Sequence, residues 1–390
     1  MAGEHAFLSA SSASAWMACA AYPTVQQWYP DVSSEHADAG TAGHLLAAMC
    51  FEQNAWPEEF MGREMLPGHP VTEEMCEWVG AYVTSVRALT QGWTTWCEQR
   101  VDYSEAIRAE GSFGTADFLA VSPDGRTLAV HDLKGGVGVK VEASGNKQLR
   151  LYALGAMRML DAIVSIEHIG RIELYIHQPR LRAEPLVDVV TPRELRLFAK
   201  QSARAARAAL KARNAPAGPP PDSFVPGESQ CRWCRHLAYC DAAKQRVDAT
   251  ATHAASGAEA LGKAMTEIPL VESWCRAVRS ETERRLLAGE DVPGWKLVRG
   301  RASARSWTDA GCAVAVLQRE LGDAAFKPRE VVSPPAAEKL LKKNPGAWQQ
   351  LLPWIEQKEG PSSVAPVSDP RPAVSGREAD LSGFDNLELL

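Results

Sequence analysis

Two aspartates and a lysine in the first half of the chain have the types and spacing of a hydrolytic metal site. The largely apolar stretch at 128–140, LAVHDLKGGVGVK, places Asp132 two positions before Lys134. Side chains alternate along a strand, so these two residues share one face. The Asp-Gly dipeptide at 124–125 is a strong hairpin signal. The register that it sets places Asp117 opposite Asp132.

This arrangement predicts a divalent-cation site. Like charges directly opposite each other in a hairpin are destabilising, so Asp117 and Asp132 require a compensating charge. Carboxylate oxygens suit Mg²⁺ or Mn²⁺. Lys134 would then position a water molecule and stabilise the charge that develops on a phosphate. The alternative is an ordinary salt bridge between Asp132 and Lys134 on a solvated face, because D-x-K alone is a weak motif.

Composition limits the other classes of function. The chain has 390 residues and a formal net charge of -6, with 45% hydrophobic and 23% charged residues. These values indicate a globular protein without a global basic signature of nucleic-acid binding, so any such surface must be local. The sequence shows neither a signal peptide nor a run of about 18 apolar residues, which predicts a cytoplasmic protein without a membrane partner. The nine cysteines are then expected to be free thiols or metal ligands.

The pattern of apolar residues and helix breakers predicts a mixture of helices and strands. Helices are expected at 35–53, 72–98, 144–161, 192–213 and near 268–288, a strand-rich block at about 97–142, and a strand at 166–179. This order favours the α/β class, with a mixed central sheet flanked by helices. A Pro-rich linker at 214–228 leads into a cysteine-rich segment, and 251–390 reads as an appended region with a short strand at 295–300.

The cysteine-rich segment CRWCRHLAYC indicates a metal or cluster site. It contains Cys231, Cys234 and Cys240, and three cysteines cannot complete a four-coordinate site. Cys19, near the start of the chain, is the candidate for the fourth ligand. One reading is a tetrahedral Zn²⁺ site with four cysteines or with His236. The other is an iron–sulfur cluster held by the four thiolates.

The helix expected at 192–213 carries a basic stripe. Its members recur every three or four residues and therefore lie on one helix face. They are Arg193, Arg196, Lys200, Arg204, Arg207 and Lys211. A stripe of this kind is either a solvated helix face or a track for DNA phosphates. The sequence leaves both readings open.

Taken together, these residues resemble the RecB-like branch of the PD-(D/E)xK nuclease superfamily. In that branch an Asp ends one strand, a D/E-x-K motif lies on the next, and a following helix carries Q-x-x-x-Y. The chain has Asp117, then DLK at 132–134, then Gln148 and Tyr152 in QLRLY. The opening SASSASAWMACAAYP further resembles a phage and prophage family of RecB-like proteins.

The resemblance implies further site residues. A helical His in AGTAGHLL completes the metal site in that branch and nominates His44. By the same analogy, the backbone carbonyl of Leu133 is a metal ligand, and Gln148 and Tyr152 hold the DNA strand. Glu98 is a further, minor candidate acid.

The iron–sulfur members of this branch suggest how the cysteines are used. They include the CRISPR-associated adaptation exonucleases and the AddB subunit. Their [4Fe–4S] cluster is held by one cysteine before the nuclease core and three after it, the layout of Cys19 and of Cys231, Cys234 and Cys240. The resemblance therefore favours a structural [4Fe–4S] cluster over Zn²⁺.

The implied organisation is a restriction-endonuclease-like core at 1–245 that the cluster staples together. A C-terminal accessory region of α+β type would follow at 251–356, and an extended or disordered tail at 357–390.

The implied function is a Mg²⁺- or Mn²⁺-dependent DNA exonuclease, encoded by a phage or prophage, that resects linear single- or double-stranded DNA during recombination. A single-strand annealing protein is the expected partner, and a homo-oligomer would be consistent with the task. The alternatives are a structure-specific endonuclease or flap nuclease, and a non-catalytic DNA-binding module of the same fold.

Overall fold

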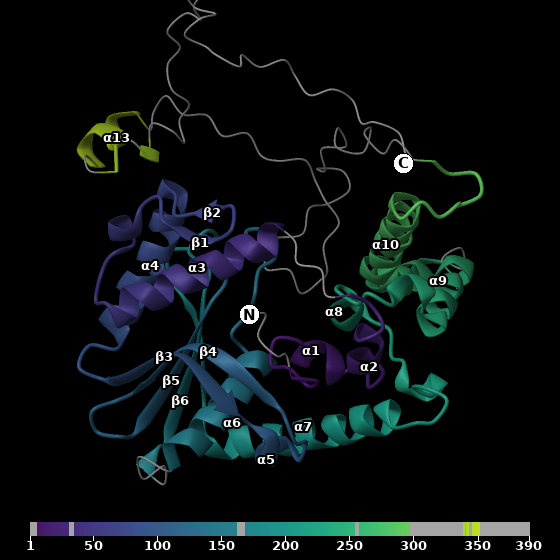
Figure 1. Ribbon diagram of the computed structural model, residues 1–390, viewed down its shortest axis with the longest axis horizontal. Coiled ribbons are helices and arrows are strands. Elements are labelled where there is room, and N and C mark those ends of the chain that lie inside the picture. The colour runs from purple at the N-terminus through teal and green to yellow at the C-terminus, as the bar shows by residue number, and fades with distance from the viewer. Residues whose placement is uncertain are drawn as a thin grey trace, which may run out of the picture. The chain divides into compact units, whose positions relative to one another are not determined.

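A five-stranded mixed sheet is the centre of the fold, which we describe from a computed structural model (Figure 1). Its strands are β3 (Thr94–Asp102), β4 (Phe113–Val121), β5 (Thr127–Leu133), β6 (Arg171–His177) and β7 (Leu186–Val190). They lie in the order β3-β4-β5-β6-β7, with β5 and β6 parallel and the other neighbours antiparallel. Parallel neighbours need a crossover, which is supplied here by α6 (Lys147–Asp161). The α/β class and the mixed central sheet were predicted and are confirmed.

The structure describes residues 6–30, 35–161, 168–253 and 257–296, together with 338–339, 341–342 and 345–351. Contacts divide the chain into two units, residues 1–298 and 299–390, and each is considered by itself. The second unit contains α13 (Pro345–Leu351). The predicted tail at 357–390 lies outside the described residues. Of the strand predicted at 295–300, only 295–296 is described, and this part is not a strand.

The β4–β5 hairpin has the register that its turn predicts. The observed partners run from Val121 with Leu128 to Phe118 with His131. At the turn, Gly125 has a φ of 68°, a conformation that glycine adopts without strain. The observed pairing ends at Phe118 and His131, so the two strands part immediately before they would pair Asp117 with Asp132.

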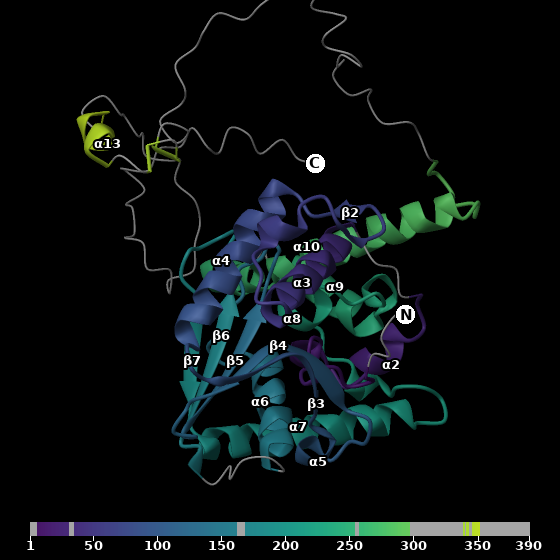
Figure 2. The ribbon, with the colours of Figure 1, turned by 60° about the vertical axis from the view of Figure 1, so that its left-hand side comes forward.

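Two layers of helices cover the sheet (Figures 1 and 2). On one face lie α6 and α7 (Pro192–Arg213), where Leu128 and Val130 of β5 join a core with Leu149. On the other face lie α3 (Glu35–Glu52) and α4 (Glu73–Leu89), where Ala129 and Leu133 join a second core. Because alternate residues of β5 enter opposite cores, both faces of this strand are buried.

The helix predicted at 72–98 is shorter in the structure. It begins where the Thr72 side chain accepts a hydrogen bond from the backbone N–H of Met75 at 3.2 Å, and it ends at Leu89. Gly92 then adopts a φ of 78°, and β3 begins at Thr94. The prediction was wrong for 90–98, because a left-handed glycine turn at Gly92 ends the helix and β3 follows at once. The helices predicted at 35–53 and 192–213 are confirmed as α3 and α7 to within one residue.

The remaining elements are short or lie outside the sheet. They are α1 (Ala13–Trp16), α2 (Tyr22–Gln26), η1 (Pro57–Phe60), β1 (Glu64–Leu66), β2 (His69–Pro70), α5 (Ser104–Ile107), η3 (Pro221–Ser223), α8 (Glu228–Cys231), η4 (Leu237–Tyr239), α9 (Asp241–His253) and α10 (Ala258–Leu287). The helix predicted near 268–288 therefore begins about ten residues earlier, as α10. The predicted boundary at 245–251 falls within α9. None of the described helices is long and apolar enough to cross a membrane.

Candidate active site

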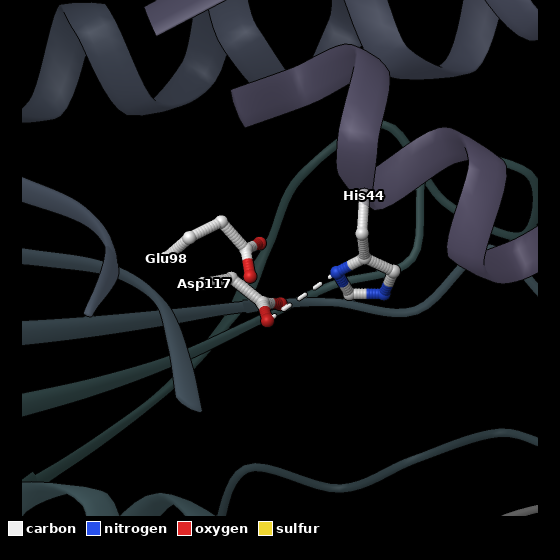
Figure 3. A group of neighbouring side chains, drawn as sticks. All are labelled: His44, Glu98 and Asp117. Carbon is white, nitrogen blue, oxygen red and sulfur yellow. Dashed lines mark ion pairs between the residues drawn. The ribbon is translucent and has the colours of Figure 1, made fainter. Parts of the chain in front are cut away.

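The candidate site lies where β4 and β5 part beneath α3. Asp117 projects from β4, and its Oδ1 atom lies 3.3 Å from Nδ1 of His44 on α3 (Figure 3). Glu98 from β3 completes a group whose ligand atoms all lie within 4.8 Å of one another. The structure thus brings three potential metal ligands together from three elements that are far apart in the sequence.

A close helix contact sets the position of His44. A Cβ atom on the preceding residue, Gly43, would lie 1.8 Å from Cη2 of Trp78 on α4, so only glycine permits this approach. The same indole lies against Gly135, where a Cβ atom would be 3.2 Å away. Trp78 therefore links the helix that carries His44 to the loop that follows Lys134.

Glu98 is placed by an unusual backbone conformation. The residues on either side of it pair with those on either side of Asp117, so Glu98 lies across the β3–β4 ladder from that aspartate. Its φ of 45° is rare for a non-glycine residue within a strand. The sequence suggested Glu98 only as a minor candidate. The register of β3 against β4 is the feature that identifies Glu98 as a neighbour of Asp117.

Buried Asp132 and partly exposed Lys134 form an ion pair. The Asp132 side chain is 1% exposed, and its Oδ2 atom lies 2.8 Å from Nζ of Lys134. Its Oδ1 atom is buried and has no hydrogen-bond partner among the described residues. Asp132 lies outside the group within 4.8 Å, so this carboxylate is not part of the compact ligand set.

The backbone of Leu133 on β5 is hydrogen-bonded to the side chain of Asp117 on β4. Its N–H donates a hydrogen bond to Oδ2 of Asp117 at 2.7 Å, in place of a ladder partner on β4. The N–H and the C=O of one strand residue point to the same neighbouring strand. We therefore expect the Leu133 carbonyl oxygen, the predicted metal ligand, to face the same opening.

The Q-x-x-x-Y pair on α6 is hydrogen-bonded to the lysine. Nζ of Lys134 donates to Oε1 of Gln148 at 3.0 Å, and Nε2 of Gln148 donates to the Tyr152 hydroxyl at 3.0 Å. Tyr152 is only 5% exposed, and a Cβ atom on Gly114 would lie 2.7 Å from its ring. In this arrangement the pair positions the ammonium group, and the buried tyrosine offers little surface to a DNA strand.

The two aspartates have pKa values shifted in opposite directions. Burial would raise the pKa of Asp117, but the charges of His44 and Lys134 and the Leu133 N–H lower it. Burial outweighs the neighbouring Lys134 at Asp132 and raises its pKa to about 6. Burial alone would lower the pKa of both His44 and Lys134. The charge of Asp117 outweighs it at His44 and raises that pKa to about 9, and the charge of Asp132 raises the pKa of Lys134.

Glu98 holds its proton more tightly than an ordinary glutamate. Partial desolvation, reinforced by the charge of Asp117, raises the pKa of Glu98 to about 7. These carboxylates repel one another at neutral pH, and a divalent cation among them would relieve the repulsion.

Gln178 is a positioning residue that the sequence did not reveal. It is 3% exposed and follows β6. Its amide donates to the Val139 carbonyl and accepts from the Val141 N–H, both at 2.8 Å. It therefore fixes the glycine-rich loop after Lys134. A polar residue after a buried strand was the only signal in the sequence.

The four predicted cluster cysteines line one cavity. Cys19 follows α1, and the other three, Cys231, Cys234 and Cys240, lie in and after α8. The backbone N–H groups of Val225 and Gly227 point at the sulfurs of Cys19 and Cys231, at 3.5 and 3.4 Å. Burial raises the pKa of Cys231 to about 11 and that of Cys234 to about 12, which favours the protonated form of these two thiols at neutral pH.

The basic stripe of α7 faces solvent. All six predicted residues are exposed: Arg193, Arg196, Lys200, Arg204, Arg207 and Lys211. The opposite face of the helix, with Leu195 and Phe198, is buried in the core beneath the sheet. Figures 1 and 2 show α7 on the side of the sheet away from α3, so the structure does not bring the stripe to the carboxylates.

One comparison with known proteins bears on the whole chain. A protein-family model matches residues 5–372. The family is described as "Protein of unknown function (DUF2800)".

Proposed function

Because the chain belongs to the DUF2800 family, whose description gives no activity, we propose a function from the geometry of the site. We propose a metal-dependent deoxyribonuclease that hydrolyses phosphodiester bonds of linear DNA. The observation that carries the proposal is the pairing of His44 with Asp117, and of Asp132 with Lys134, where β4 and β5 part. The sequence resemblance to RecB-like PD-(D/E)xK nucleases, with their acid–acid–lysine arrangement, supports the same class.

The donor atoms fit a hard divalent cation. One imidazole and two carboxylates lie within 4.8 Å of one another, and the unpartnered Oδ1 of Asp132 is a further acceptor nearby. Oxygen-rich sets of this kind suit Mg²⁺ or Mn²⁺. We propose His44 and Asp117 as ligands together with Glu98, the third member of the compact group, and, as the resemblance implies, Asp132 and the Leu133 carbonyl. A bound ion would stabilise charge on the phosphate and lower the pKa of an attacking water.

Lys134 acts in its protonated form. Burial opposes the charge on Lys134, but the charges of Asp132 and Asp117 outweigh it, raise the pKa and favour the ammonium form. Held by Asp132 and Gln148, it orients the water and stabilises the negative charge that develops on the phosphate. The water displaces the 3′-oxygen in line, which leaves a 5′-phosphate on the product.

The cysteines fit an iron–sulfur cluster better than a zinc ion. Four thiolates around zinc, with Zn–S bonds of about 2.3 Å, lie about 3.8 Å apart in a tetrahedral site. No three of Cys19, Cys231, Cys234 and Cys240 have sulfurs within 4.8 Å of one another in the described residues. We propose that they hold a [4Fe–4S] cluster, which needs wider spacing and accepts backbone N–H groups aimed at its sulfurs. Its role would be to tie the two ends of a PD-(D/E)xK core together.

We further propose end resection of phage or prophage DNA in the bacterial cytoplasm as the task, beside a single-strand annealing protein. Substrate topology tests this reading. Anaerobically purified protein with Mn²⁺ or Mg²⁺ should degrade linear duplex or single-stranded DNA and leave a covalently closed circle intact. Cutting of the circle would instead favour the endonuclease alternative.

A matched pair of variants connects the activity to the site. Asp117→Asn should abolish degradation, whereas Asp161→Asn, at the exposed end of α6, should leave it unchanged. If neither metal supports cleavage of linear, nicked or single-stranded DNA by the wild-type protein with an intact cluster, the nuclease proposal fails. The non-catalytic DNA-binding reading would then take its place.

A further inference from the structure

A second potential binding surface lies apart from the carboxylate site. A groove of about 470 Å³ runs between the cysteine segment at 228–240 and α10. Aromatic and basic side chains line it, among them Tyr29, Trp233, Arg232, Arg235, Arg276 and Arg284. Neither the proposed catalytic residues nor the basic stripe of α7 contributes to it.

Trp233 gives the groove an exposed aromatic ring. Its side chain is 71% exposed, although a large apolar side chain would gain free energy from burial. The guanidinium carbon of Arg232 lies 5.8 Å from the centroid of the indole. Trp233 also lies between Cys231 and Cys234, so ligation of these two cysteines would hold its backbone in place.

The groove is locally positive in a chain of negative net charge. Four arginines and one glutamate line it, against a formal charge of -6 for the whole chain. The glutamate, Glu281, is already paired with Arg284 at 2.7 Å, and hydrogen bonding to that arginine helps to lower its pKa to about 2. Arg232 and Arg276, on opposite walls, are exposed. The charge therefore fits a polyanion.

We propose that this groove binds a single-stranded segment of DNA, with a base stacked on Trp233 and phosphates held by Arg232 and Arg276. Positive side chains that follow a backbone, combined with an exposed aromatic ring, form the usual platform for unpaired bases. The bases of a duplex are already stacked on one another and gain nothing from the indole. The inference rests on the proposed function only in taking DNA as the nucleic acid.

Binding by fluorescence anisotropy tests the proposal in a Lys134→Ala background, without added divalent metal, so that cleavage plays no part. The probes are a labelled oligo(dT) and a hairpin duplex. Trp233→Ala should weaken binding of the single strand by roughly five- to a hundredfold, the range for one lost stacking contact, and leave duplex binding nearly unchanged. Trp295→Ala is the matched control, because Trp295 is also 71% exposed but lies outside the groove.

Two further variants separate stacking from charge and from misfolding. Trp233→Phe keeps an aromatic ring and should retain most of the single-strand affinity. Arg276→Ala should reduce the salt slope for the single strand by about 0.7, the value for one lost phosphate contact. Arg279 is an exposed arginine of the same helix outside the groove, so Arg279→Ala should leave the salt slope unchanged.

Three results would overturn the inference. Trp233→Ala behaves like Trp295→Ala, or it weakens single-strand and duplex binding equally, or polyglutamate displaces oligo(dT) at equal charge concentration. The last result would indicate an acidic protein partner. Binding that depends on Trp233 in a protein without nuclease activity would remove the proposed function and leave this inference standing.

Discussion

At the residue scale, the site uses two aspartates that differ in their partners. Asp117 is held by His44 and by a backbone N–H, which lower its pKa. Asp132 is 1% exposed and has an unpartnered oxygen, and burial raises its pKa to about 6. Environments that push the pKa values of two neighbouring carboxylates apart are typical of catalytic sites.

The pKa of His44 predicts how stability depends on pH without metal. Its folded-state value of about 9 exceeds the ordinary value of about 6.5, so charged His44 stabilises the fold. This contribution is complete below about pH 6.5 and is lost as the pH rises through 9. The difference in unfolding free energy between wild type and His44→Gln should shrink by on the order of 1–3 kcal/mol across this range. Urea unfolding at both pH values measures it.

The affinity for a metal ion should depend on pH in the opposite direction to the stability of the metal-free protein. An ion binds neutral His44, so Mn²⁺ must displace the proton and should bind more tightly as the pH rises towards 9. Calorimetric titrations in two buffers of different ionisation enthalpy measure the protons released. Mn²⁺ affinity that is flat between pH 6.5 and 9 would contradict the assignment of His44 as a ligand.

At the element scale, close contacts place the side chains of the candidate site. Gly43 lets α3 approach Trp78 of α4, and Gly114 lets β4 approach Tyr152 of α6. Both glycines are adjacent in sequence or in space to site residues. Packing of helices on both faces of the sheet therefore helps to set the geometry of the candidate site.

A glycine pair on α3 tests this role. Gly43→Ala should destabilise the protein by about 1–3 kcal/mol, because the added methyl group overpacks the contact with Trp78 and displaces α3. Gly40→Ala, on the same helix with no atom within 4 Å, should be neutral or stabilising, because alanine has the higher helix propensity. Thermal unfolding and Mn²⁺ affinity of the two variants measure the effect. Equal effects of Gly43→Ala and Gly40→Ala would contradict a specific role for the contact between Gly43 and Trp78.

Local signals explain which parts of the fold could be predicted. The Asp-Gly turn fixes the β4–β5 register, so the neighbourhood of Asp117 and Asp132 follows from the sequence alone. The prediction missed the end of α4, although Gly92, which adopts a left-handed conformation, is a helix-stop signal in the sequence. The sequence could not show that Glu98 lies near Asp117, because this depends on the β3–β4 pairing and on a φ of 45° at Glu98. The contact of His44 with Asp117 is tertiary, and only the family resemblance suggested it.

At the scale of the whole first unit, the cysteine cavity joins distant parts of the chain. Cys19 lines the same cavity as Cys231, Cys234 and Cys240, which lie more than 200 residues later in the chain. A cluster there closes a loop of more than 200 residues, which restricts the unfolded chain far more than a short loop does. The proposed cluster would therefore stabilise the fold without taking part in hydrolysis.

Loss of one cysteine should remove the cluster. Cys19→Ser should reduce the iron and sulfide content and the visible absorbance of anaerobically purified protein, and should lower its melting temperature. Cys275→Ser, on α10 outside the cavity, should change none of them. Zinc in place of iron in the wild type would show that the site is a zinc site.

The most direct test of the central claim compares two lysines on one segment. Lys134 pairs with buried Asp132, whereas Lys140 pairs with Glu142 at the surface, where its side chain is 65% exposed. Cleavage of an end-labelled linear duplex with Mn²⁺ should fall by at least about a hundredfold in Lys134→Ala and stay near wild type in Lys140→Ala. Equal activity of Lys134→Ala and the wild type would contradict a hydrolytic site built on Asp117, Asp132 and Lys134.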